Sequence, residues 1–142
     1  MQFQPLTMGH RITAGFFTLL MLTMAYLQLN DPDPALWVAV YLTLAGLTLL
    51  GSVLGRQKLV AGAALAVAVV WAATLAPSAY ELFANHPAGD LLTGMSPDRP
   101  YVEEAREAGG LLIGALAMLH LVLARKRPTD ELNQAPFHAQ VG

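Results

Sequence analysis

Carboxylate side chains gather in two short segments of the chain, just before residue 34 and between residues 103 and 107. These segments supply the candidate contact residues Asn30, Asp31, Asp33, Glu103, Arg106 and Glu107. In a helix Glu103 and Glu107 share one face, because they are four residues apart. Carboxylate oxygens are the ligands that calcium and magnesium prefer. The sequence therefore predicts that Asp31, Glu103 and Glu107 hold a divalent cation, or that the cluster binds a polar head group.

A purely structural role explains the same residues. Asp33 is well placed to cap a helix that begins at Pro34, and glutamates stabilise the positive end of a helix. Arg106 can pair with Glu103, its neighbour on the same helix face. Sequence spacing leaves the ligand site and the structural role both open.

Histidine offers a second candidate chemistry. His120 lies within an apolar segment and His10 just before another, and a pair of imidazoles is one way to ligate haem. A buried histidine that hydrogen-bonds to a neighbouring helix is the more ordinary arrangement. His120 is thus a haem candidate, while the sequence as a whole requires no cofactor.

Several functional classes are excluded or disfavoured by composition. The chain has no cysteine, so thiolate metal sites, iron–sulfur clusters and cysteine nucleophiles are excluded. None of its serines has a histidine and a carboxylate at suggestive positions. A net charge of -2 and the lack of a glycine-rich phosphate loop disfavour nucleic-acid and nucleotide binding. We expect no enzymatic activity and no nucleic-acid partner.

The elements that must position these residues are membrane spans. Of 142 residues, 55% are hydrophobic and 13% are charged, and the charges fall outside four long apolar runs. A bilayer core needs about 20 helical residues. We expect an all-α, polytopic membrane protein, a four-helix transmembrane bundle in one domain over residues 1–127. Its spans cover about 12–30, 34–55, 59–80 and 104–124, with a long extracytoplasmic loop over 81–103 between the third and fourth helices.

Basic residues indicate the orientation of these spans. Six of the eight lysines and arginines lie before the first span, between the second and third, or after the fourth. The positive-inside rule then places both termini in the cytoplasm, including the tail over 128–142. The acidic segments consequently face the opposite side. Short loops and ordinary span lengths fit a bacterial inner membrane.

Glycine spacing suggests where helices approach each other. Gly51 with Gly55, and Gly110 with Gly114, form small-xxx-small pairs, which allow close helix packing in lipid. Such pairs also arise by chance in apolar helices. The pattern favours a compact bundle without fixing which faces meet.

Two motifs carry a resemblance to a known family. The string Leu-Gln-Leu-Asn-Asp-Pro-Asp-Pro over 27–34 is followed by Trp37 and Tyr41, and Glu-Glu-x-Arg-Glu over 103–107 leads to Gly110 and Leu111. In these motifs the chain resembles the transmembrane protein 220 family, whose members are small and multi-spanning. The resemblance implies the fold rather than an activity. It also implies that both segments belong to one recurring feature.

Two functions remain open from the sequence. The first is a non-enzymatic accessory or assembly subunit, which packs its helix faces against the other subunits of a larger membrane complex. The alternative is a stand-alone membrane protein that binds a divalent cation or a polar head group at the acidic cluster. In both cases the lipid bilayer is its surroundings.

Overall fold

The protein is all-α in the part of the chain that its computed structural model describes, residues 6–30, 33–54, 58–92, 96 and 98–124. Five α-helices and two short 3-10 helices follow one another along the chain. In order they are α1 (Met8–Leu27), η1 (Gln28–Asn30), α2 (Pro34–Leu54), α3 (Lys58–Thr74), α4 (Ala76–Asn85), η2 (Ala88–Leu92) and α5 (Pro100–Leu123).

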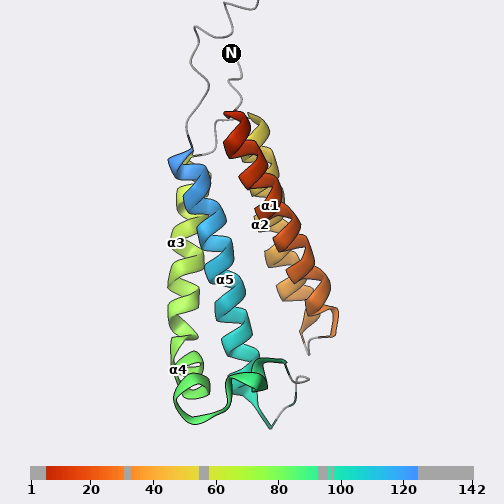
Figure 1. Ribbon diagram of the computed structural model, residues 1–142, viewed down its shortest axis with the longest axis vertical. Helices are drawn as coiled ribbons and strands as arrows, with labels where there is room; N and C mark the ends of the chain where they lie inside the picture. The colour runs from red at the N-terminus through yellow and green to blue at the C-terminus, as the bar shows by residue number, and fades with distance from the viewer. Residues whose placement is uncertain (1–5, 31–32, 55–57, 93–95, 97, 125–142) are drawn as a thin grey trace, which may run out of the picture.

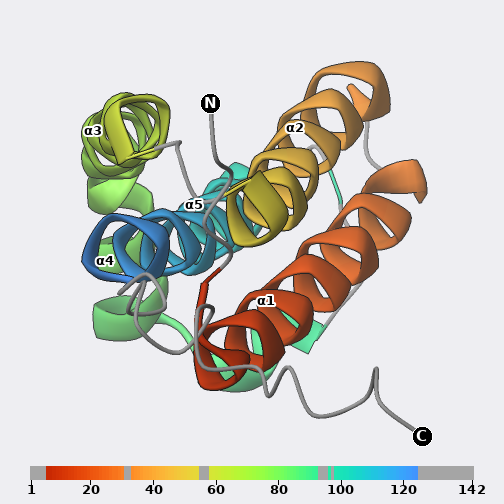
Figure 2. The same cartoon turned by 90° about the horizontal axis from the view of Figure 1, so that it is seen from above.

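The long helices form two pairs that meet along α5. Helix α1 packs beside α2, and α3 packs beside α5 (Figure 1). Viewed along the bundle, α5 lies between the α1–α2 pair and α3 (Figure 2). Helices α2 and α3 contact each other much less than either contacts its own partner. The bundle is therefore more open between α2 and α3 than elsewhere.

Glycines bring α2 and α5 into close contact. Side chains of α2 fill the space at two glycines of α5, Tyr41 at Gly110 and Leu44 at Gly114. In the other direction, Leu121 of α5 fills the space at Gly51 of α2. Both glycines of the pair predicted on α5 thus lie in a helix contact, as does Gly51, whereas Gly55 is outside the described residues.

The segment expected as the third span is two helices rather than one. Helix α3 ends at Thr74, and α4 begins at Ala76 after a bend of 48°. Pro77 explains the break, because proline has no N–H to donate and its ring clashes with the carbonyl four residues earlier. The chain therefore turns away from the bundle axis before it reaches Tyr80, where the sequence predicts the span to end.

Helix α4 and η2 fold against the start of α5 and form what we call the cap, residues 76–92 (Figure 1). Leu82 is fully buried and packs with Val102 and Ala105 of α5. The hydroxyl of Ser78 donates a hydrogen bond to Glu104 Oε2. Within the segment expected as a loop over 81–103, residues 81–85 belong to α4 and 88–92 to η2, both of which contact α5, and residues 100–103 are the start of α5 itself.

Two described helices, α2 and α5, are each long and apolar enough to cross a membrane. The bent pair of α3 and α4 gives a third crossing if it forms one span. These helices support a polytopic membrane protein, but with fewer clear spans than the four that the sequence predicts, because α1 is not among them. Within the described helices most serine and threonine hydroxyl groups donate to a carbonyl oxygen of their own helix, as Thr48 does to Leu44 O at 2.7 Å, which satisfies them in an apolar setting.

Candidate cation site

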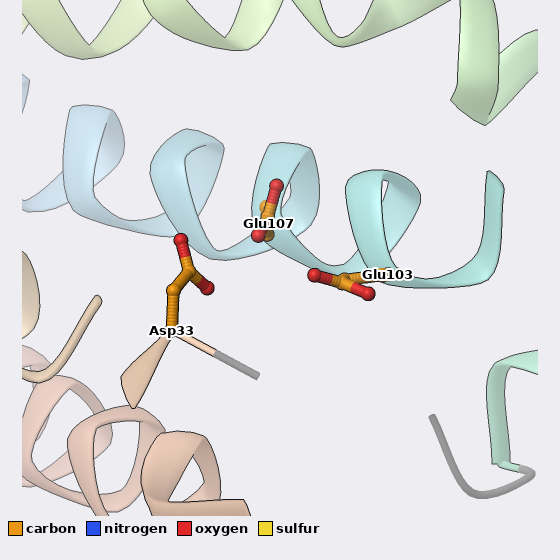
Figure 3. A group of neighbouring side chains, drawn as sticks. All are labelled: Asp33, Glu103 and Glu107. Atoms are coloured by element: carbon orange, nitrogen blue, oxygen red, sulfur yellow. The ribbon is translucent and has the colours of Figure 1, made fainter. Parts of the chain in front are cut away.

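Three carboxylates converge where the start of α2 meets the first turns of α5. One oxygen each from Asp33, Glu103 and Glu107 lies within 4.8 Å of the other two. Asp33 points from α2 toward α5, on which the two glutamates occupy successive turns (Figure 3). Asp33 is exposed, Glu103 is half-buried, and Glu107 is buried, with 6% of its surface exposed. We call these three residues the acidic triad.

Local sequence explains why the triad forms. Asp33 directly precedes Pro34, which begins α2 because its fixed φ suits the first turn of a helix. On α5 the spacing of four residues puts Glu103 and Glu107 on one face. That face meets α2 one turn further on, where Tyr41 fills the space at Gly110. The close approach of α2 and α5 at Gly110 therefore keeps Asp33 beside the two glutamates.

The other residues of the predicted site have different surroundings. Asp31 lies outside the described residues, as does the side chain of Asn30, whose backbone belongs to η1. Arg106 turns to the cap instead, where its Nε donates to the carbonyl oxygen of Leu91 at 2.9 Å. Asp33 joins Glu103 and Glu107 in the cluster that the structure describes, in the place where the sequence predicts Asp31 as the third ligand.

His86 belongs to the cap rather than to the triad. Its ring stacks on Tyr101 with centroids 4.1 Å apart, and its Nε2 lies 3.5 Å from Glu81 Oε1. The ring contact joins the end of α4 to the first turn of α5, whereas the contact with Glu81 lies within α4 and its C-terminal end. They give His86 a structural role in the cap.

The two histidines near the other end of the bundle lie side by side. The rings of His10 on α1 and His120 on α5 have centroids 5.0 Å apart. His120 Nε2 donates to the backbone carbonyl oxygen of His10 at 3.1 Å. This hydrogen bond and the ring contact link α1 to α5.

A feature that the sequence does not reveal is an apolar groove of about 350 Å³ between α2 and α3. It is lined along α2 from Leu36 to Leu47 and along α3 from Ala64 to Trp71, with Leu111 of α5 at its floor. The Trp71 ring lies 5.1 Å from that of Trp37 between centroids. The sequence shows that these side chains are apolar, but it does not show how far apart α2 and α3 pack, and the groove depends on that distance.

Comparison with known proteins identifies the family. The family described as "Transmembrane family 220, helix" matches residues 19–123, which include the acidic triad and most of the described helices. No curated protein and no solved structure shows significant similarity to the chain. The match covers well over half of the chain, from within α1 to the end of α5. This small helical membrane protein therefore belongs to transmembrane family 220, as the two motifs predicted.

Proposed function

We propose that this protein is an integral membrane protein that binds a cation at the acidic triad. The observation that supports it is the convergence of Asp33, just before α2, with Glu103 and Glu107 of α5, with oxygens within 4.8 Å of one another. Two like charges about 4 Å apart repel by about 1 kcal/mol in water and by several times more near a protein surface. A cation held among the three carboxylates lowers this repulsion.

The spacing of the triad suits more than one kind of cation. Calcium is surrounded by oxygens at about 2.3–2.6 Å, so ligands on its opposite sides are about 5 Å apart. Acceptors around a tetrahedral ammonium, at hydrogen bonds of about 2.8 Å, are about 4.6 Å apart. Oxygens within 4.8 Å of one another are compatible with both. Burial of Glu107 also strengthens any interaction there, because the local dielectric is lower than in water.

The proposed topology places the triad on the extracytoplasmic side. Every acidic residue in the described part of the chain lies at the end of the bundle that carries the cap, whereas Arg11 and Lys58 begin α1 and α3 at the opposite end. The positive-inside rule assigns the end with Arg11 and Lys58 to the cytoplasm. In this topology α1 is the first of four spans, since between Ile12 and Leu27 it carries no acidic or basic residue.

Thermal unfolding of the detergent-purified protein tests cation binding. Calcium, magnesium, manganese or ethanolammonium is added separately, and a ligand at 100 times its dissociation constant stabilises a site by about 2.7 kcal/mol. We expect at least one of them to raise the melting temperature. The shift is expected to disappear in the double variant Asp33→Asn, Glu107→Gln.

A matched control uses carboxylates outside the triad. Glu81, which contacts His86 in the cap, is replaced by Gln, and the cation-dependent shift should survive. If no cation changes the melting temperature, or if the shift survives in the double variant, the triad is not a cation site.

A second candidate function is that of an accessory subunit in a larger membrane complex. It is supported by glycines of the long helices that no other described residue covers, since an added Cβ at Gly15, Gly46 or Gly62 meets nothing within 4 Å in that part of the chain. Small residues at a helix surface allow another helix to approach closely in lipid. Extraction from native membranes in mild detergent should then yield a complex larger than the single chain on a native gel. A free monomer would contradict this function.

A further inference from the structure

Along both α2 and α5, the apolar groove begins about one helical turn from a residue of the acidic triad. On α5 Leu111 forms the groove floor, and Glu107 lies four residues earlier, on the same helix face and one turn nearer the cap. On α2 Leu36 begins the groove, and Asp33 lies three residues before it. The carboxylates of Asp33 and Glu107 thus lie about one helical turn beyond the end of the apolar groove.

The groove offers its occupant almost only hydrocarbon. Among the described residues of its lining, Thr43 carries the one hydroxyl, which already donates to Ala39 O at 2.7 Å. From Leu36 to Leu47 the groove follows α2 for about 16 Å at 1.5 Å per residue, about half of a 30 Å bilayer core. This is the depth that an alkyl chain occupies in one leaflet.

The end of the groove offers the complementary charge. A primary ammonium has three N–H donors, and the triad places one carboxylate oxygen from each of three residues within 4.8 Å of the others. Charge-assisted hydrogen bonds of this kind are short and strong. Trp71 lines this end of the groove, and its ring lies beside that of the buried Trp37, with centroids 5.1 Å apart.

We propose that the groove and the acidic triad together bind one membrane lipid with a primary ammonium head group, its alkyl chain in the groove and its ammonium among Asp33, Glu103 and Glu107. This proposal rests on the cation site proposed above and names its ligand class. A transmembrane helix from a partner is a less suitable occupant. Such a helix needs about 20 residues and 30 Å, whereas the groove is about half as long, and its 350 Å³ lies in the usual range of ligand pockets.

Tryptophan quenching tests the proposal, because the protein has two tryptophans, of which Trp71 lines the groove and Trp37 lies against Trp71. The whole protein is placed in phosphatidylcholine nanodiscs with a small fraction of lipid brominated on its acyl chains. The brominated lipid is either phosphatidylethanolamine or phosphatidylcholine with identical chains. These two differ at the nitrogen, where phosphatidylcholine has no N–H donor.

We expect brominated phosphatidylethanolamine to quench at about tenfold lower mole fraction than brominated phosphatidylcholine, the preference that one or two charge-assisted hydrogen bonds confer. The double variant Asp33→Asn, Glu107→Gln should quench equally with both lipids. Ala39→Leu, which narrows the groove from an exposed position, should weaken quenching by brominated phosphatidylethanolamine. Ala63→Leu, at an exposed position of α3 outside the groove, should leave it unchanged.

Equal quenching of the unmodified protein by both lipids overturns the proposal without any variant. A head-group preference that persists in the double variant, or cross-linking of a partner helix within the groove in native membranes, overturns it as well. If metal ions raise the melting temperature through the triad while phosphatidylethanolamine is not preferred, only the lipid assignment fails and the cation site remains. If there is neither a cation-dependent shift in melting temperature nor a preference for phosphatidylethanolamine, the cation site and the lipid assignment are both wrong.

Discussion

The phenol of Tyr41 on α2 lies against Gly110 on α5, where the absence of a side chain leaves room for it. A Cβ atom at Gly110 would lie 2.6 Å from Tyr41 Cζ, closer than real Cβ contacts allow. Tyr41 is fully buried, and Gly110 follows Glu107 by one turn on α5. This contact therefore determines both how closely α2 and α5 pack and how near Asp33 comes to the two glutamates.

Gly110→Ala should lower the melting temperature of the protein. The added methyl displaces a buried phenol, and overpacking of this kind typically costs about 1–3 kcal/mol. The neighbouring variant Gly109→Ala is the control, because a Cβ there meets nothing within 4 Å. Alanine at an open helical position should stabilise by up to about 1 kcal/mol. Equal melting temperatures for the two variants would contradict the contact between Tyr41 and Gly110.

Leu82→Ala should release the cap from α5. Leu82 is fully buried against Val102 and Ala105, and the loss of a buried leucine side chain typically costs about 2–5 kcal/mol. Hydrogen exchange of the amides in residues 76–92 should become faster. Phe83→Ala is the matched control, since Phe83 is 64% exposed and its removal should leave exchange in the cap nearly unchanged.

His120→Phe should weaken the link between α5 and α1, because it keeps an aromatic ring and removes the donor to His10 O. The expected loss in unfolding free energy is about 0.5–1.5 kcal/mol, the usual net value of one hydrogen bond. His10→Phe retains the backbone acceptor and should cost less. The comparison requires only chemical or thermal unfolding of the two variants. A larger loss for His10→Phe would mean that the ring contact, and not the hydrogen bond, joins the helices.

Asp33→Asn should change stability in opposite directions with and without a bound cation. Asparagine is as favourable as aspartate before the first turn of a helix, so the substitution removes charge without placing an unfavourable residue before α2. In a chelator the variant should melt higher than the unmodified protein, because repulsion within the triad falls. With a saturating cation ligand the order should reverse. The same order under both conditions would argue against a cation in the triad.

The all-helical membrane character of the chain follows from its sequence. Long apolar runs with charges only between them cannot form a water-soluble domain, and in lipid a helix satisfies every backbone donor and acceptor within itself. The motif around Asn30 to Pro34 and that around Glu103 to Glu107 were enough to predict the family. Their helical spacing also predicted that Glu103 and Glu107 share a face.

Other features depend on packing between segments far apart in the chain. The sequence contains Pro77, but whether a proline kinks a membrane span or ends it depends on what the following residues contact. In this protein α4 packs against Val102 and Ala105 of α5. Likewise, an alanine-rich helix can pack on any of its faces. That α3 packs on α5 and leaves a groove toward α2 is decided by side-chain fit, which spacing along one helix does not encode.

The acidic triad illustrates this division between sequence and structure. Its residue types and the face shared by its two glutamates are determined by the sequence alone. Three other features depend on the distance between α2 and α5, which the contact between Tyr41 and Gly110 sets. They are the position of Asp33 beside the two glutamates, the burial of Glu107 and the apolar groove. The physical reason is that local spacing determines the direction of a side chain on its own helix, whereas the distance between helices depends on the volumes of all the side chains packed between them.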